Sequence, residues 1–516
     1  MSAARTIFAA AGLIMLAAII LPSQVLAQTG DADNGEAVYF QRCVGCHGDE
    51  GDGLGPAAER LNPPPRDFTL GQYKFKTTGF DDIVPNDADL IRMISDGMPG
   101  TAMPGWSDVL SDQDILDLVA YIKIFAALDE EEPSDQVDYG SQIAASPESI
   151  ATGRELFLKD DRCAECHGQE GRGDAVKKLK DDNGDRTWPR NLTKPWTFRA
   201  SNDPKDIFTR ISVGIPGTQM PSFADPVSKK KLTIEERWHV ANYVASLAKT
   251  EEVVAPEKTV IKALRVSEAL PTSPEDALWD TAESATFFLV PQIIAKERFF
   301  TPANDTVTVR ALFDDETLAL LVEWDDRTNS IPGDAKAESI ADPDMGEDAM
   351  AVQFPVTVSD GMEKPYFLLG DVAHPVNLWR WSSGTAEAPQ TVSMLDARGM
   401  EDIAARDAAP AGMAGEGVWR DGSWRVVLRR ALVTGDGEND TQFADGALIP
   451  LSVLAWDGSN GEIGGKHTLT TWYWLRLGAP GGGSSYLAAV LVALAVGALE
   501  LWWLYNVRRR RAAQSA

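Results

Sequence analysis

Two short stretches, Cys43-Val44-Gly45-Cys46-His47 and Cys163-Ala164-Glu165-Cys166-His167, contain all four cysteines of the chain. Cysteines at this spacing reach the two vinyl groups of one haem, and the histidine that follows them lies beneath the iron. A zinc site would need four ligands, and each stretch offers three. The pattern therefore predicts two covalent c-type haems, with His47 and His167 each as one axial ligand of the iron.

The sequence around these sites forms a repeat whose copies are about a hundred residues long, the size of a small haem domain. Gly97-Met98-Pro99-Gly100-Thr101-Ala102-Met103-Pro104 aligns with Gly214-Ile215-Pro216-Gly217-Thr218-Gln219-Met220-Pro221. Met98 therefore aligns with an isoleucine, whereas Met103 aligns with Met220. A methionine thioether is a common sixth ligand of iron in electron-transfer haems. We therefore expect Met103 and Met220 to complete the two irons.

A helix is expected at both ends of each copy. At the start a glycine precedes an aromatic residue by one helical turn, which suits a close helix crossing; the pairs are Gly35 with Tyr39 and Gly153 with Phe157. At the end, apolar residues at helical spacing follow a capping box; the boxes are Ser111 with Asp114 and Thr233 with Glu236.

An arginine follows the Gly-rich loop in both copies. These are Arg66 and Arg190, each preceded by a proline. A guanidinium group can bind carboxylates through two hydrogen bonds, so both arginines are candidates for contacts with haem propionates. Exposed loop arginines are the alternative interpretation.

Together these motifs resemble class I cytochrome c domains. The resemblance covers residues 28–128 and 146–250 and implies two all-α domains that transfer electrons. An acidic linker, residues 129–145, separates them and begins with Asp129-Glu130-Glu131-Glu132-Pro133.

Residues 1–27 have the pattern of an export signal. Arg5 precedes an apolar run from Ile7 to Leu21, and Val25-Leu26-Ala27 resembles a site cut by export peptidases. We expect cleavage there, and an uncleaved anchor is the alternative.

Residues 484–507 are predicted to form a transmembrane helix, followed by a basic cytoplasmic tail at 508–516. Trp502, Trp503 and Tyr505 lie near the end of the apolar run, directly before four arginines. Glu500 interrupts the run, and an amphipathic surface helix is the alternative. Because basic residues remain on the cytoplasmic side, we expect a single-pass inner-membrane protein whose domains face the periplasm.

The formal net charge of −29 argues against nucleic-acid partners, since phosphates would be repelled. An acidic surface suits basic electron-transfer partners or serves solubility alone.

From about residue 258 the pattern changes to strands. Alternating apolar residues at 307–311 and 318–324 predict one hairpin, and Asp421-Gly422 predicts the turn of another. The predicted fold class is therefore multidomain: two all-α cytochrome c domains, an all-β sandwich domain at 258–478 and one transmembrane helix.

The sandwich region resembles the haem b domain of the ethylbenzene dehydrogenase γ-subunit family. The motifs that carry this resemblance are Trp324-Asp325-Asp326, Glu347 to Pro355, His374 to Trp381 and Lys466 to Trp472. The resemblance implies a non-covalent haem b held between a methionine and a lysine. It also implies that electrons come from a molybdenum enzyme of the dimethyl-sulfoxide-reductase type II group.

Lys466 occupies the position of the family's lysine. Leu369 stands where we place the family's methionine, so the second ligand is open among His374, Met350 and Met345. A structural role is the alternative for each.

We therefore expect a non-catalytic multi-haem subunit that relays electrons between molybdenum oxidoreductase catalytic subunits and soluble or membrane cytochromes of the respiratory chain. The alternative is a di-haem shuttle whose sandwich binds no haem and serves as a docking or carbohydrate-binding module.

Overall fold

The computed structural model describes most of the chain. The described residues are 29–61, 63–99, 101–159, 162–174, 179–182, 184, 186–248, 259–295, 304–340, 345–358, 363–478 and 483–514. The expected export signal, residues 1–27, lies outside them. The chain divides near Gln136 into two compact units.

The first unit is a helical haem domain. Its elements are α2 (Ala32–Arg42), α3 (Val44–His47), η1 (Ala58–Arg60), α4 (Asp87–Asp96) and α5 (Asp112–Ile124). Helices α2 and α5 cross where a Cβ on Gly35 would lie 2.0 Å from the carbonyl oxygen of Asp117. Only glycine allows this approach, so the predicted close crossing is confirmed. The predicted capping box of Ser111 and Asp114 begins α5.

The second unit begins with a helical domain of the same design. Its elements are α6 (Pro147–Leu158), α7 (Ala164–His167), β1 (Leu179–Lys180), β2 (Arg186–Thr187), η3 (Pro195–Thr197), α8 (Pro204–Val213) and α9 (Ile234–Ser246). A Cβ on Gly153 would lie 2.0 Å from the carbonyl oxygen of His239 in α9. Within the expected linker, the carbonyl oxygen of Tyr139 accepts a hydrogen bond from Trp238 Nε1 of α9. Part of that acidic segment therefore packs on the second haem domain.

The same unit continues into a large antiparallel β-structure, with two parallel pairings at β3. Its strands are β3 (Val260–Arg265), β4 (Ala285–Phe288), β5 (Val290–Pro291), β6 (Thr306–Phe313), β7 (Thr317–Asp325), β8 (Ala349–Pro355), β9 (Val376–Gly384), β10 (Pro389–Ala397), β11 (Ile403–Arg406), β12 (Ala414–Arg420), β13 (Ser423–Ala431), β14 (Leu448–Trp456), β15 (Thr468–Leu469) and β16 (Tyr473–Leu477). Four short helices lie between the strands: η4 (Ala277–Thr281), α10 (Ala335–Ile340), η5 (Ala409–Ala411) and η6 (Gly458–Asn460). The main strand order is β11-β10-β9-β8-β14-β16-β3-β6-β7-β13-β12.

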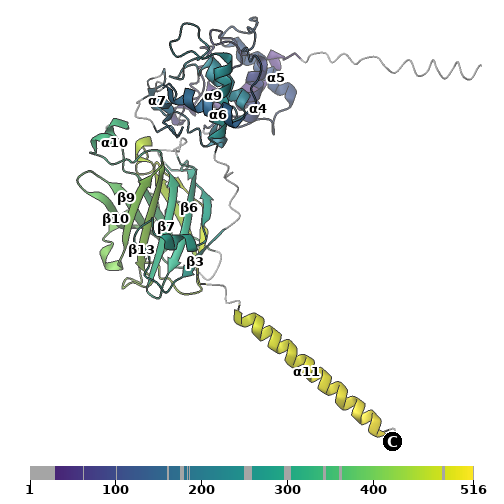
Figure 1. The fold of residues 1–516 in the computed structure, drawn as a ribbon, viewed down its shortest axis with the longest axis vertical. Helices are drawn as coiled ribbons and strands as arrows, with labels where there is room; N and C mark the ends of the chain where they lie inside the picture. The colour runs from purple at the N-terminus through teal and green to yellow at the C-terminus, as the bar shows by residue number, and fades with distance from the viewer. Residues whose placement is uncertain are drawn as a thin grey trace, which may run out of the picture. The chain divides into compact units, whose positions relative to one another are not determined.

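Both predicted hairpins are confirmed. Strands β6 and β7 pair with Val309 opposite Val322, and Figure 1 shows β6, β7 and β13 side by side. Strands β12 and β13 are joined at Asp421 and Gly422, whose φ angles are 54° and 76°. Two successive residues with positive φ are what a tight two-residue hairpin turn requires.

The two halves of the sheet enclose one apolar core, as expected for a sandwich. Trp324 of β7 and Trp424 of β13 contact Trp381 of β9, at ring distances of 6.2 and 4.7 Å. The three side chains are at most 3% exposed. These tryptophans are therefore core residues, and they offer no exposed rings for stacking on sugars.

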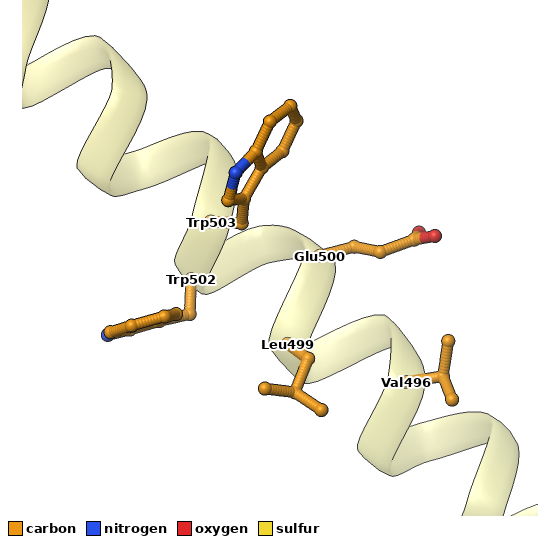
Figure 2. A pocket seen from close by; sticks show the side chains of 5 residues that line it. All are labelled: Val496, Leu499, Glu500, Trp502 and Trp503. Carbon is orange, nitrogen blue, oxygen red and sulfur yellow. The ribbon is translucent and has the colours of Figure 1, made fainter.

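Helix α11 (Gly483–Gln514) ends the described chain. Val490–Arg511 has a mean hydropathy of 1.7, and the helix is long and apolar enough to cross a membrane. Figure 2 shows a shallow hollow whose side chains, Glu500 among them, all come from this one helix and point outward. The hollow is thus the bare surface of α11. The multidomain fold class is confirmed.

Candidate haem centres

Each Cys-x-x-Cys-His stretch forms one short helical turn. In the first, the amide nitrogens of Cys46 and His47 lie 3.1 and 3.0 Å from the carbonyl oxygen of Cys43. The second repeats these hydrogen bonds at Cys163, at 3.1 and 2.9 Å. The turn places the two cysteines on one helical face. None of the four cysteines forms a disulfide.

Each histidine is oriented by a backbone carbonyl of a distant loop. His47 Nδ1 lies 3.0 Å from the carbonyl oxygen of Arg66, and His167 Nδ1 lies 3.1 Å from that of Arg190. A carbonyl only accepts, so Nδ1 carries the proton and Nε2 keeps its lone pair for a metal. Burial lowers the pKa of both rings, which keeps them neutral at pH 7. These are the properties of an iron-ligating histidine.

The two methionine loops are closed by matching glycines. A Cβ on Gly97 would lie 2.9 Å from the carbonyl oxygen of Met103, and one on Gly214 would lie 2.8 Å from that of Met220. Both glycines have positive φ, 70° and 75°. Met220 packs against the same apolar core as Cys163. The two loops therefore have matching backbone conformations at these glycines, as the sequence alignment predicts.

Beside the second haem turn, three guanidinium groups influence one another. Burial, together with the charges of Arg199 and Arg327, lowers the pKa of Arg190 to about 10. Three cations that interact in a buried region favour a nearby anion, and a haem propionate is such an anion. Arg327 belongs to the sandwich, and its guanidinium lies 4.9 Å from the ring of Trp188. The sequence did not indicate Arg199 or Arg327, because neither lies in the repeated motifs.

The structure places the expected haem b residues on separate elements of the sandwich. Lys466 is half-buried in the turn before β15. His374 is half-buried, with Nδ1 3.2 Å from Asp371 Oδ1 and Nε2 3.5 Å from Glu363 Oε1. Both of its ring nitrogens thus face carboxylates at the surface, which disfavours His374 as a ligand.

The two methionines lie in different apolar clusters. Met350 is fully buried in the sandwich core, opposite Trp381 of the neighbouring strand. Met345 packs with Ala337 in a separate small cluster. Leu369 is buried with a φ of 62°.

A buried histidine lies next to Lys466. His467 is 1% exposed, its Nδ1 lies 3.3 Å from the carbonyl oxygen of Thr468, and its ring is 5.1 Å from that of Trp456. Its buried Nε2 has no hydrogen-bond partner among the residues that the structure describes. Burial lowers the pKa of this ring to about 4. A neutral imidazole with a free buried nitrogen fits an iron ligand. Its place directly before the buried strand β15 was the only sequence signal for it.

Ion pairs join the second haem domain to the sandwich. Lys194 Nζ lies 3.0 Å from both Asp305 Oδ1 and Asp325 Oδ2, and its side chain is only 5% exposed. Trp196 Nε1 donates to Asp305 Oδ2 at 2.7 Å. Burial lowers the pKa of Lys194, but Asp325 and Asp305 raise it more, so the lysine is charged.

Three family models match the chain, one on each domain. They are the cbb3-type cytochrome c oxidase subunit III at residues 30–122, cytochrome c at 150–248 and ethylbenzene dehydrogenase at 276–414. The models therefore identify two cytochrome c domains, which carry covalent haem c, ahead of an ethylbenzene dehydrogenase domain.

Individual proteins are similar to parts of this chain. Cytochrome c55X of Stutzerimonas stutzeri is 32% identical and aligns over 23% of this chain and 91% of its own. A candidate respiratory nitrate reductase heme subunit, ORF7, of Haloferax mediterranei is 25% identical, over 43% of this chain and 74% of its own. A chain of the Kuenenia stuttgartiensis reducing HAO-like protein complex is 36% identical, over 42% of this chain and 97% of its own, with a TM-score of 0.39.

Proposed function

This chain belongs to the cytochrome c family, and on that premise we propose that it is a membrane-anchored, periplasm-facing subunit that relays electrons between a molybdenum-type oxidoreductase and the respiratory chain. The similarity to a nitrate reductase heme subunit supports an oxidoreductase partner. The ethylbenzene dehydrogenase domain supports the molybdenum class. The apolar helix α11 supports the anchor.

The observation that carries the proposal is the matched orientation of His47 and His167 by the carbonyls of Arg66 and Arg190. In each domain the two cysteines hold the haem through thioether bonds and the histidine ligates the iron through Nε2. Met103 and Met220 would be the second protein ligands of the two irons, so that neither haem would offer a position to a substrate. Each haem c then supplies a one-electron iron couple whose potential is raised by the methionine.

For the sandwich, the proposal includes one non-covalent haem b at the turn that contains Lys466 and His467. The buried nitrogen of His467 fits such a group, and the resemblance to the γ-subunit family supports Lys466. To ligate iron, the lysine would have to lose its proton, whereas the imidazole is already neutral. Neighbouring residues cannot bind opposite faces of one haem, so only one of Lys466 Nζ and His467 Nε2 would ligate the iron.

Pyridine haemochrome spectra of the full chain, matured with a cytochrome c assembly system, test this proposal. We expect two haems c and one haem b per polypeptide. Fewer than two haems c would contradict the electron-relay function itself. Two haems c without haem b would instead favour the di-haem shuttle with a haem-free docking module.

A further inference from the structure

Three buried aspartates meet at one end of the sandwich. Asp326 directly follows β7, Asp348 directly precedes β8 and Asp457 directly follows β14. One carboxylate oxygen from each lies within 4.8 Å of the other two. The three side chains are 2%, 0% and 0% exposed. Like charges this close and this buried need compensation.

Hydrogen bonds satisfy only part of this cluster. Asp348 accepts from the amide nitrogens of Ser330 and Gly458, at 2.6 and 2.9 Å, and from Trp424 Nε1 at 3.0 Å. Asp326 Oδ1 accepts a hydrogen bond from the amide nitrogen of Thr328. Asp457 Oδ1 accepts one from the hydroxyl group of Ser459. The other oxygens, Asp326 Oδ2 and Asp457 Oδ2, are buried without a hydrogen-bond partner among the described residues.

Other charged groups near the three aspartates do not compensate their negative charge. Glu462 adds a fourth carboxylate, and Arg327 is the cation that interacts with Asp457, Asp326 and Glu462. One guanidinium cannot offset four buried carboxylates, so the cluster lacks positive charge.

We propose that Asp326, Asp348 and Asp457 bind a calcium ion. The donors are all oxygen, which selects hard divalent cations over zinc or copper. Oxygens bound to one Ca²⁺ at about 2.3–2.6 Å can lie up to roughly 5 Å apart, which accommodates the observed spread. The buried Asn329 Oδ1, in the same loop as Asp326, also has no donor among the described residues and is a further candidate ligand. Backbone carbonyls and water would supply the remaining positions.

The position of this site gives it a structural role beyond the proposed electron relay. Asp326 lies between Asp325, which pairs with Lys194, and Arg327, which covers Trp188. An ion held by Asp326 would therefore fix the loop through which the sandwich contacts the second haem domain. Loss of the ion should loosen that contact without releasing haem c, which is bound covalently.

The test uses the full-length haem-loaded chain in detergent, stripped with EGTA and titrated with CaCl₂ in a calorimeter. We expect one Ca²⁺ per chain and a higher temperature of thermal unfolding with the ion bound. Asp326→Asn and Asp457→Asn should each weaken binding about tenfold or more, because each removes one ligand charge. Asp436→Asn, whose carboxylate pairs with Arg406 in another acidic cluster, is the matched control and should leave binding unchanged.

Should a variant misfold, the wild-type titration still decides the question. A fully stripped wild-type chain that binds no Ca²⁺ overturns the proposal. Binding that survives in both variants at wild-type affinity overturns it too. Stabilisation by acidification alone, without a response to Ca²⁺, would show that protons rather than a metal neutralise the cluster.

Discussion

Lys194 of the second haem domain lies 3.0 Å from Asp325, the last residue of strand β7 in the sandwich. The lysine side chain is almost fully buried, and a second carboxylate, that of Asp305, also contacts it. The next two residues of the same loop are Asp326 and Arg327. Asp326 belongs to the buried carboxylate cluster, and Arg327 reaches the ring of Trp188 in the haem domain. One loop thus links the haem domain to the interior of the sandwich.

Replacing Lys194 with methionine should destabilise the contact by about 3–5 kcal/mol, because it leaves Asp305 and Asp325 without their cation. Differential scanning calorimetry on the full chain measures this loss. Lys230→Met is the matched control, since its pair with Glu165 is far more accessible to solvent, at 44% and 38% exposure, and should contribute at most about 1 kcal/mol. Equal effects of the two substitutions would contradict the assigned role of Lys194.

The same contact predicts a pH dependence. The pKa of Lys194 is raised in the folded chain, so its stabilisation is fully present below the unfolded value of about 10.4. The stabilisation should be lost as the pH rises through the higher folded pKa. Thermal unfolding between pH 8 and pH 11 should therefore show a steeper alkaline loss for the wild type than for Lys194→Met.

The methionine assignments can be separated by substitution and redox titration. Met103→Ala should remove the methionine–iron charge-transfer band of one haem and lower its potential, because the soft thioether favours reduced iron. Met220→Ala should do the same to the other haem. Met98→Ala is the control and should change neither. A spectral loss in Met98→Ala alone would show that the alignment of the two loops is wrong.

Substitution can distinguish the two candidate haem b ligands, Lys466 and His467. Either Lys466→Ala or His467→Ala should lower the haem b content while two haems c remain attached, and the variant that does so identifies the ligand. His374→Ala should keep haem b, because both of its ring nitrogens face surface carboxylates. Pyridine haemochrome spectra measure the result. Haem b that persists in both variants would exclude this turn as its site.

The anchor is tested by truncation. Deleting residues 484–516 should release a soluble protein with both haems c, since the apolar helix is removed. Deleting only residues 512–516 leaves the helix and the four arginines intact and should keep the chain in the membrane fraction. A truncated chain that still sediments with membranes lacking the partner would argue against α11 as the anchor.

Gly35 offers a test of the first haem domain. Gly35→Ala should destabilise it by about 1–3 kcal/mol or more, because the new Cβ would meet the backbone carbonyl of Asp117. Gly45→Ala, in the helical turn between the cysteines, meets nothing within 4 Å and should be tolerated. The haem domain's thermal unfolding, followed by haem absorbance, distinguishes the two.

The sequence by itself determined the features that depend on local spacing. The two Cys-x-x-Cys-His turns, the capping boxes of Ser111 and Thr233 and the turn at Asp421-Gly422 are each specified within a few residues. Their conformations follow from hydrogen bonds and backbone preferences over one or two turns of chain. The repeat added a comparison of the chain with itself, which singled out Met103 and Met220 and their matching loops.

Only the tertiary structure decided which distant side chains meet and which become buried. It paired His47 with the carbonyl of Arg66 and placed the ring of His374 against surface carboxylates. It buried His467, which directly precedes β15. It also brought together Asp326, Asp348 and Asp457, which lie at the ends of three separate strands. Each of these residues is ordinary in its local sequence. Their environment arises from strand pairing and burial across more than a hundred residues, and no local pattern encodes desolvation by a distant segment.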